Sequence, residues 1–371
     1  MPILILALSG RALAQAAKRA GADVMVSDFF GDMDTRSLAH WHRLPGDLLD
    51  GIKGRELLDW ARASDQPIEG IAYGAGFEAT PAVLGELTQI APLIGNASQI
   101  VAAVKDPFGF AELLRRLDLP HPEVAAAPRS GTCWLRKLRG GSGGTHIERA
   151  TEALSAASDN HYFQAEATGN PVSALFAANG RAARVLGLSA QWAAPTPVQP
   201  FRYCGCAGPL RLAPKLADSI ERACHAITAA TGLVGLNSLD MLATDDAFTI
   251  LEINPRPGAT LDVFDDPQSP SLWDCHVGGS RGELPARKAA DMSSARAAMV
   301  VYTQETRYVP AKFKWNSYIA DIPAPNSRIS VDTPVCTVMA AGSTAGAARA
   351  LAEERAARLL SRLPLLLQRS A

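Results

Sequence analysis

The segment FTILEINPRPG, residues 248–258, brings an acid, an amide and a guanidinium together on a stiff stretch of chain. In an extended backbone Glu252, Asn254 and Arg256 share one face, because side chains on one face of a strand repeat every two residues. The prolines on either side of Arg256 restrict the backbone and keep the three polar groups aligned. Carboxylate and amide oxygens suit Mg²⁺, and a guanidinium suits a phosphate. The segment therefore predicts a site that binds magnesium and phosphate.

A second acid, Asp240, precedes this segment in SLDMLATDDAFTILEI. Two strands joined by a turn at residues 244–247 would bring Asp240 beside Glu252. A pair of acids in a hairpin is usually only solvated, but here Asn-Pro-Arg-Pro-Gly follows directly. We therefore expect Asp240, Glu252 and Asn254 to be ligands of Mg²⁺, with Mn²⁺ as a substitute ion.

A glycine-rich stretch, WLRKLRGGSGGTHI at residues 134–147, is a second candidate for phosphate binding. Glycines let backbone N–H groups converge on an anion, and the preceding lysine would neutralise phosphate charge. The stretch has neither the GxxxxGK[ST] pattern nor the GxGxxG pattern of dinucleotide folds, and a flexible surface turn is the alternative. The residues concerned are Lys137, Gly140, Gly141, Ser142, Gly143 and Gly144. The histidine that follows, His146, is given no role, because a lone histidine is more often structural.

These residues must be positioned by a chain that alternates strands and helices in its first hundred residues, which is typical of a parallel α/β sheet. We expect strands at residues 3–8, 22–28 and 69–76, and helices at 11–20, 96–120 and 215–231. Residues 191–212, rich in Pro, Cys and Gly, are expected to be an irregular connector. The chain should end in loops, short strands and an amphipathic helix that packs on the protein.

Composition places the chain among ordinary globular proteins. Its 371 residues favour two to four domains, and the net charge of −1 without a basic run disfavours nucleic acid as a partner. No apolar stretch is long enough to span a membrane, and the N-terminus lacks the basic region of a signal peptide. The six scattered cysteines, including Cys204-Gly-Cys206, lack zinc-site spacing. A cytoplasmic protein with reduced thiols is therefore expected.

Lys105 in VAAVKDP, the Lys137–glycine segment and, about a hundred residues later, D…ExNPRPG together resemble the ATP-grasp superfamily. Its members activate a carboxylate as an acyl phosphate with ATP and capture it with an amine. The resemblance implies a multidomain fold of α/β and α+β character. We expect a Rossmann-like N-terminal domain (1–98), an ATP-grasp subdomain with the glycine loop (99–163), a second with the metal site (164–270) and a β-rich C-terminal segment with a terminal helix (271–371).

The resemblance also assigns roles to single residues. Lys105 and Lys137 would bind phosphates, the glycine segment would close over them, and Arg256 would stabilise charge during catalysis, with Lys137 contributing. Adenine would be held at residues 162–176. The adenine contacts implied are the Gln164 side chain and the backbones of Ala165 and Ala167. The acid that often binds ribose is missing here, because Pro171 or Val172 takes its place.

Shorter segments narrow the resemblance. YGAGFEATP, LIGN, DIPAPNSRI and TPVCTVMAAG are similar to a group of predicted ATP-grasp carboligases related to the biotin carboxylase core and to tyramine–glutamate and one-carbon-cofactor glutamate ligases. In that group Asn326 replaces a glycine expected in a turn. The substrate contacts implied are Ser9, Gly10, Gly74, Gly76, Phe77 and Glu78. Glu78 either pairs with a substrate ammonium or caps the next helix.

The leading hypothesis is therefore an ATP- and Mg²⁺-dependent carboxylate–amine ligase, with glutamate ligation in cofactor synthesis as one version of it. The substrates would be a small carboxylate and a small amine, and a homodimer is one expected assembly. A carboxylase that converts bicarbonate to carboxyphosphate is a second hypothesis. A non-catalytic nucleotide-binding protein is a third, although binding alone does not need all the metal acids and Arg256. A Rossmann oxidoreductase is weaker, because ALSGRALA lacks GxGxxG.

Overall fold

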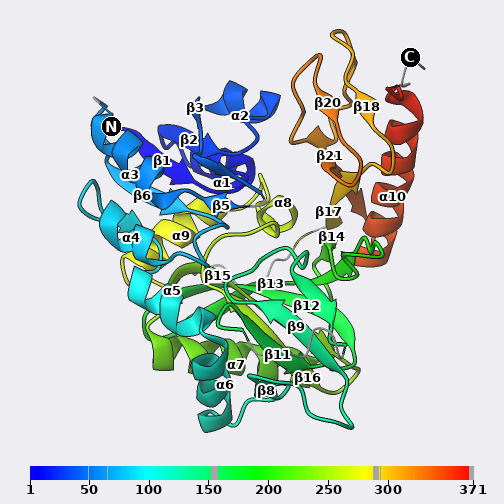
Figure 1. Ribbon diagram of the computed structural model, residues 1–371. Helices are drawn as coiled ribbons and strands as arrows, with labels where there is room; N and C mark the ends of the chain where they lie inside the picture. Colours follow the sequence, from blue (N-terminus) through cyan, green and yellow to red (C-terminus); the bar gives the residue numbers. More distant parts are fainter. Residues whose placement is uncertain (49, 65, 152–157, 287–291, 293, 367–371) are drawn as a thin grey trace.

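The computed structural model describes residues 1–48, 50–64, 66–151, 158–286, 292 and 294–366. In Figure 1 the N-terminal domain (blue) and the C-terminal helix (red) lie at the upper left and upper right, above the central region (cyan to lime). No helix in the described ranges combines the length and apolar character needed to cross a lipid bilayer.

The N-terminal domain is built on a parallel sheet of order β3-β2-β1-β6-β7. Its strands are β1 (Ile3–Leu6), β2 (Val24–Asp28), β3 (His40–Arg43), β6 (Gly70–Tyr73) and β7 (Leu93–Ile94). Its helices are α1 (Arg11–Arg19), α2 (Met33–Leu38), α3 (Gly54–Ala63) and α4 (Ala82–Leu87), and β4 (Gly46–Asp47) pairs with β5 (Gly51–Ile52). β1, β2 and β6 are fully buried, as continuous apolar runs in parallel sheets usually are. The predicted alternation of strand and helix is confirmed.

The helical region expected at residues 96–120 consists of two helices, α5 (Ser98–Lys105) and α6 (Pro107–Arg116). Asp106 separates them, because the residue before a proline is disfavoured in the helical conformation. Asp106 then caps α6 by accepting a hydrogen bond from Gly109 N at 2.7 Å. The break leaves Lys105 as the last residue of α5, where its side chain can reach beyond the helix.

Two antiparallel sheets follow. The smaller has the order β10-β9-β11-β8 and comprises β8 (Val124–Ala125), β9 (Trp134–Leu138), β10 (Ile147–Arg149) and β11 (His161–Ala165). The larger has eight strands in the order β16-β15-β12-β13-β14-β17-β21-β19. They are β12 (Asn170–Asn179), β13 (Ala183–Ala193), β14 (Tyr203–Gly208), β15 (Val234–Ala243), β16 (Phe248–Asn254), β17 (Ala295–Tyr302), β19 (Ile319–Ala320) and β21 (Pro334–Gly342).

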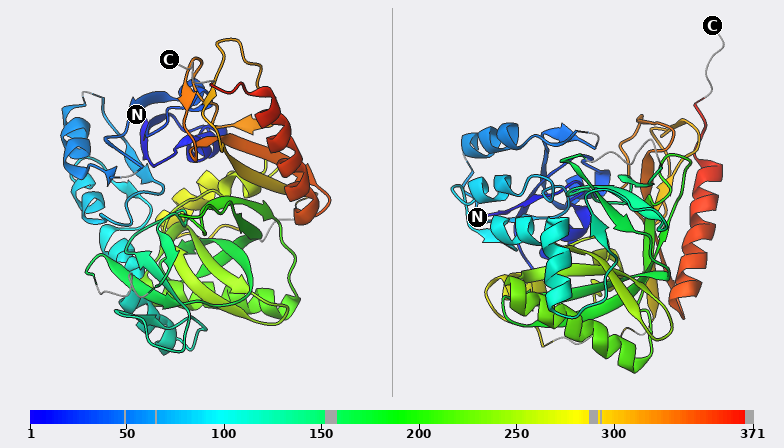
Figure 2. Two further views of the ribbon diagram at one scale, coloured as in Figure 1. Left: turned by 45° about the vertical axis from the view of Figure 1, so that its right-hand side comes forward. Right: turned by 60° about the horizontal axis from the view of Figure 1, so that its bottom comes forward.

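Separate apolar clusters hold the remaining elements against this large sheet. Helix α7 (Pro214–Thr231) packs on β12, β13, β15 and β16, and α10 (Ala345–Arg362) packs on β17 and β21. Helices α8 (Leu261–Phe264) and α9 (Leu272–Ser280) lie between the sheet and α1, which joins the N-terminal domain to it. Strands β18 (Arg307–Tyr308) and β20 (Arg328–Ile329) form a small pair in the C-terminal region. Two further views show α10 along one side of the molecule (Figure 2).

The expectation of an irregular connector at residues 191–212 holds for 194–202 and 209–212 and is wrong for the rest. β13 continues to Ala193, and β14 is an interior strand paired with β13 and β17. The small residues there reflect close packing, since a β-carbon at Gly205 would lie 2.5 Å from Ala298 O. β14 thereby connects β17 and β21 to the central sheet, so the C-terminal strands continue that sheet. Asn326, noted as a glycine substitute, has a φ of +63°, which a glycine adopts without strain.

The N-terminal and C-terminal parts of the chain meet around the buried side chain of Arg11. Its guanidinium donates to Asp262 Oδ2 at 2.6 Å and to Asp321 Oδ1 at 2.9 Å. The carboxylate of Asp34 accepts from the backbone N–H groups of Asp321 and Ile322. Asp32, at the start of α2, is also buried, and its Oδ2 has no hydrogen-bond partner in the described structure. This interface contains more carboxylates than cations.

Asp32 should make this interface sensitive to pH. Burial, together with Asp321, Asp28 and Asp34, raises the pKa of Asp32 to about 8. Between the ordinary pKa of an aspartate and about pH 8, the folded protein keeps a proton on Asp32 that the unfolded chain releases. The free energy of unfolding therefore falls by about 1 kcal/mol per pH unit as the pH rises through this range. We expect Asp32→Asn to be more stable than the wild type at pH 9, with a smaller gain at pH 5, in urea unfolding. The exposed Asp245→Asn is the control, and a pH-independent difference for Asp32→Asn would contradict the expectation.

Candidate active site

The β15–β16 hairpin places two carboxylates side by side. Asp240 is the register partner of Glu252, and Ser238 is the partner of Asn254. A bulge follows between Asp240 and Met241, as is common beside active sites. The predicted pairing of Asp240 with Glu252 is therefore confirmed as a feature of the fold.

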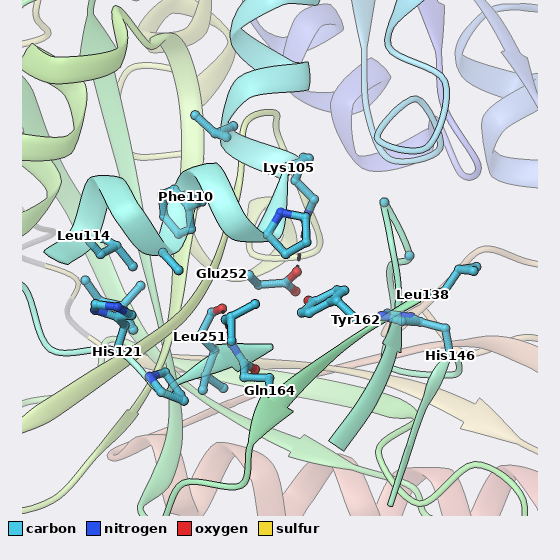
Figure 3. Close-up of a pocket in the computed structure, with 18 residues that line it drawn as sticks. Lys105, Phe110, Leu114, His121, Leu138, His146, Tyr162, Gln164, Leu251 and Glu252 are labelled. Carbon is cyan, nitrogen blue, oxygen red and sulfur yellow. Dashed lines mark hydrogen bonds and ion pairs between the residues drawn. The ribbon is translucent and has the colours of Figure 1, made fainter. Parts of the chain in front are cut away.

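The lysine at the C-terminal end of helix α5 contacts one of these two acids. Lys105 Nζ donates to Glu252 Oε2 at 3.0 Å and to Ile253 O at 3.2 Å, and it lies 3.4 Å from Asn254 Oδ1. Figure 3 shows the Lys105 and Glu252 side chains meeting at the edge of a pocket. On the other acid, Ser173 Oγ donates to Asp240 Oδ1 at 2.6 Å and Asn254 Nδ2 donates to Oδ2 at 2.8 Å.

The two carboxylates have opposite electrostatic environments. Burial and the neighbouring Glu252 raise the pKa of Asp240. Burial also acts to raise the pKa of Glu252, but Lys105 and Lys137 outweigh it and lower that pKa. Two acids that face each other and ionise unequally are an arrangement that a divalent cation would relieve.

The donor set fits Mg²⁺ in chemistry and in number. Asp240, Glu252 and the amide oxygen of Asn254 supply oxygens, which hard cations prefer, and Mg²⁺ commonly keeps its other positions for water and phosphate. Within the described residues no group of three or more His, Cys, Asp or Glu side chains gathers at metal-binding distance. The candidate site therefore depends on two carboxylates and one amide, and it would be completed by a ligand's own oxygens.

Arg256 is held from the N-terminal domain. Its Nε donates to Glu78 Oε1 at 2.7 Å, and the two side chains are 11% and 2% exposed. Glu78 was expected either to bind a substrate ammonium or to cap a helix. The structure shows no helix cap from Glu78 and uses this carboxylate as the partner of Arg256, while binding of a substrate ammonium stays a prediction.

The glycine segment packs between two other parts of the chain, residues 78–79 and the segment around Phe201. A β-carbon at Gly140 would lie 2.5 Å from Ala79 Cα, and one at Gly144 would collide with the carbonyl of Phe201. Tyr203 N also donates to Gly143 O at 2.9 Å. Gly140, Gly143 and Gly144 all have positive φ angles, which residues with side chains rarely adopt. Glycine is needed here for close approach as well as for backbone conformation.

Lys137 and His146 flank this loop from the interior. Lys137 is 4% exposed, and burial lowers its pKa, with Glu252 opposing and Lys105 adding to that effect. Burial also lowers the pKa of His146, so its ring is neutral at pH 7. His146 lies against Gly141 and lines the same pocket as Lys105 and Glu252, although sequence reasoning gave it no role. Its position directly after the glycine loop was the only clue.

The pocket lies between α6, the small sheet and β16. In Figure 3 Gln164, Leu251 and His121 lie together, while Tyr162 and His146 lie toward the glycine loop. Its apolar wall consists of Val104, Pro107, Phe110, Leu114, Val124, Leu138 and Ile250. Gln164 Nε2 donates to Leu251 O at 3.2 Å. Ala165 and Ala167 do not line the pocket, and Ala165 N donates to Glu123 O, so their contact with a purine stays a prediction.

The residues predicted to bind substrate lie in different environments. Gly10 N donates to Asp28 Oδ2 at 2.9 Å, so one of the chain's own carboxylates binds the N-terminus of α1 at this predicted substrate contact. Phe77 is 1% exposed and packs in the N-terminal core. Gly76 N donates to Glu78 Oε2, whereas Ser9 is exposed. Gly74 packs closely against Ala7, where a β-carbon would be 2.9 Å away.

Sequence reasoning missed the polar contacts that fix the NPRPG segment. The fully buried Asn96 donates from Nδ2 to Asn237 Oδ1 and to Pro255 O, both at 2.8 Å. Its Oδ1 accepts from Val234 N, and its carbonyl accepts from Tyr73. Asn96 thus ties the end of the N-terminal domain to the backbone beside Arg256. The LIGN motif contains it, but nothing in the local sequence indicates its distant partners.

Comparison with known proteins bears on the fold of the chain and on one of its domains. Residues 104–260 match the family model of the ATP-grasp domain, and no curated protein matches the chain. The 2-oxoglutarate carboxylase biotin carboxylase domain of Hydrogenobacter thermophilus matches with a TM-score of 0.72 at 12% identity, over 98% of this chain and 90% of that one. Carboxyaminoimidazole ribonucleotide synthase of Aspergillus clavatus matches with a TM-score of 0.69 at 14% identity, over 98% of this chain and 99% of that one. Phosphoribosylamine–glycine ligase of Thermotoga maritima matches with a TM-score of 0.69 at 16% identity, over 99% of this chain and 98% of that one. At these identities the likeness shows the fold, and it confirms the expected fold class.

The packing of the glycine loop can be tested with a matched pair of substitutions. Gly140→Ala and Gly143→Ala both place a side chain at a positive φ, but only the first meets backbone atoms, those of Ala79 and Glu78. We expect hydrogen–deuterium exchange across residues 139–146 to accelerate on the order of fivefold in Gly143→Ala and at least about tenfold more in Gly140→Ala. Equal acceleration in the two variants would show that the loop does not rest on residues 78–79.

Proposed function

We propose, from the premise that residues 104–260 belong to the ATP-grasp domain family, that this protein is an ATP- and Mg²⁺-dependent carboxylate–amine ligase acting through an acyl phosphate. One observation carries the proposal. Glu252 and Lys105 line a pocket with an apolar wall, Asp240 faces Glu252 in the hairpin, and Lys137 lies close enough to stabilise the charge of Glu252. This combination of charges suits a polyphosphate and a divalent cation together.

Each part of the site has a place in that reaction. The apolar wall would cover adenine, with Gln164 at its polar edge, and Lys105 and Lys137 would neutralise phosphate oxygens. Mg²⁺, held by Asp240, Glu252 and Asn254, would supply charge neutralisation at the phosphates. Lys105 now bonds Glu252, so it would exchange that partner for a phosphate oxygen when nucleotide binds.

The chemistry needs positioning more than it needs a side-chain nucleophile. A carboxylate oxygen of the acid substrate attacks the γ-phosphorus of ATP, the bond to the β-phosphate oxygen breaks, and ADP leaves. The amine then attacks the acyl carbon, inorganic phosphate leaves, and the nitrogen loses a proton. Arg256 would stabilise the charge on the oxygens of both transition states. The closed glycine loop would exclude water, which would otherwise hydrolyse the acyl phosphate.

Bicarbonate is the second candidate acid. The same groups would form carboxyphosphate from bicarbonate, and the whole-chain likeness to a biotin carboxylase domain favours retaining this candidate. Glutamate ligation in cofactor synthesis stays a finer proposal that rests on sequence motifs. A non-catalytic nucleotide-binding role is disfavoured by the clustered acids and by the buried Arg256.

The cellular compartment, the partners and the domain division are proposed on separate grounds. Five of the six cysteines are buried as thiols, which suits a reducing compartment such as the cytoplasm. The near-neutral net charge does not favour a nucleic acid as a partner. A homodimer stays a proposal. So does the division into domains at residues 1–98, 99–163, 164–270 and 271–371.

Coupled ADP release with Mg²⁺-ATP tests the proposal across a panel of carboxylates, amines and bicarbonate. Turnover that needs one acid and one amine would support the ligase, and turnover with bicarbonate as the only acid would support the carboxylase. We expect Glu252→Ala and Arg256→Ala each to lower ADP release by about a hundredfold or more while circular dichroism is unchanged.

Exposed residues of α6 provide the matched controls. Glu112→Ala and Arg115→Ala remove an acid and an arginine that pair with each other on the surface, and their rates should stay within about twofold of wild type. Near-normal turnover in both Glu252→Ala and Arg256→Ala would overturn the assignment of the site.

A further inference from the structure

Glu78 lies where the N-terminal domain touches the catalytic segment, and both of its carboxylate oxygens are in use. Oε1 accepts from Arg256 Nε at 2.7 Å, and Oε2 accepts from Gly76 N at 2.7 Å. The side chain is 2% exposed, so water does not compete for either bond. A carboxylate fixed at both oxygens is a rigid acceptor.

The charge of Glu78 is retained despite its burial. Burial acts to raise the pKa of Glu78, but Arg256 and then Lys105 outweigh it and lower that pKa. The carboxylate is therefore ionised at neutral pH, and Arg256 is its nearest cation. A buried charge that keeps one partner at 2.7 Å strongly constrains the position of that partner.

In the described part of the chain, the guanidinium of Arg256 is held along one edge. Its Nε is bound to Glu78, and Nη1 has a long contact of 3.5 Å with Pro257 O. Among the described residues, none makes a hydrogen bond with Nη2. The Glu78 bond thus orients the guanidinium plane and leaves its Nη side for an anionic ligand, which a planar fork of donors can bind with two bonds.

The glycine loop rests on the same short stretch of chain. The missing β-carbon of Gly140 would lie 2.6 Å from Glu78 O and 2.5 Å from Ala79 Cα. The residue that orients Arg256 therefore also forms part of the surface on which the phosphate loop closes. Placement of the arginine and closure of the loop both depend on residues 78–79.

We propose that Glu78 is a positioning residue for Arg256, through which the N-terminal domain sets the orientation of the guanidinium in the closed site. This inference rests on the proposed function, in which Arg256 stabilises transition-state charge. It also removes Glu78 from the groups that can bind a substrate ammonium. The acceptor amine must find its carboxylate or carbonyl partners elsewhere.

The test compares Glu78→Gln, Glu78→Asp and the control Glu86→Gln, which alters an exposed acid of the same domain. We expect Glu78→Gln to lower kcat for ADP release at least about tenfold and to change KM for ATP less than about twofold, because Glu78 does not line the nucleotide pocket. Glu78→Asp keeps the negative charge, so its kcat should lie between the kcat of Glu78→Gln and that of the wild type. When the protein already carries Arg256→Lys, adding Glu78→Gln should lower kcat by less than about twofold further, because the partner of Glu78 is already lost.

A spectroscopic measurement separates this inference from the proposed function. In ¹H–¹⁵N spectra the Nε–Hε resonance of Arg256, assigned by its loss in Arg256→Lys, should exchange slowly with water in the wild type and rapidly in Glu78→Gln. An unchanged Arg256 resonance, or kcat within twofold of wild type in a folded Glu78→Gln, would overturn the inference. If the wild type releases no ADP with any substrate, the proposed function fails, and the resonance still decides whether Glu78 positions Arg256.

Discussion

Two carboxylates that cannot move apart are the constraint on which the rest of the site depends. The register of the β15–β16 hairpin fixes Asp240 opposite Glu252, and burial increases the repulsion between them. Lys105 and Lys137 compensate on the Glu252 side, while Ser173 and Asn254 donate hydrogen bonds to Asp240. The Lys105 ammonium lies next to Glu252, at a position that a metal ion would share. This arrangement of charges is what the proposed binding of a cation together with a polyphosphate requires.

The N-terminal domain completes this site from outside it. Asn96 binds the backbone at Pro255, and Glu78 binds the side chain of Arg256, so both contacts to the NPRPG segment come from a different part of the chain. The glycine loop closes on residues 78–79 of the same domain. The N-terminal domain therefore contributes contacts to the candidate active site, in addition to its candidate role in binding substrate. A change in its orientation would alter the arginine and the phosphate loop together.

Local sequence was sufficient for features whose partners are close in the chain. The alternation of strands and helices, the hairpin, the pairing of Asp240 with Glu252 and the ATP-grasp fold class could all be predicted. Residues 203–208 were misread as part of a connector, because Cys and Gly indicate loops locally, whereas here small side chains allow β14 to pack between β13 and β17. The roles of Glu78 and Asn96 could not be predicted. Glu78 binds Arg256 from 178 residues away, and the Asn96 side chain binds Asn237 and Pro255 from 141 and 159 residues away, and no local pattern encodes such contacts.

The transfer of oxygen from the acid substrate to phosphate tests the central claim most directly. A pool of carboxylic acids labelled with ¹⁸O in their carboxylates would be incubated with Mg²⁺-ATP, a pool of amines and the wild-type protein, with bicarbonate removed. Formation of an acyl phosphate followed by amine capture predicts inorganic phosphate that carries one ¹⁸O atom, detected by mass spectrometry. Turnover that releases only unlabelled phosphate would show that the acid is not phosphorylated, and it would contradict the ligase mechanism.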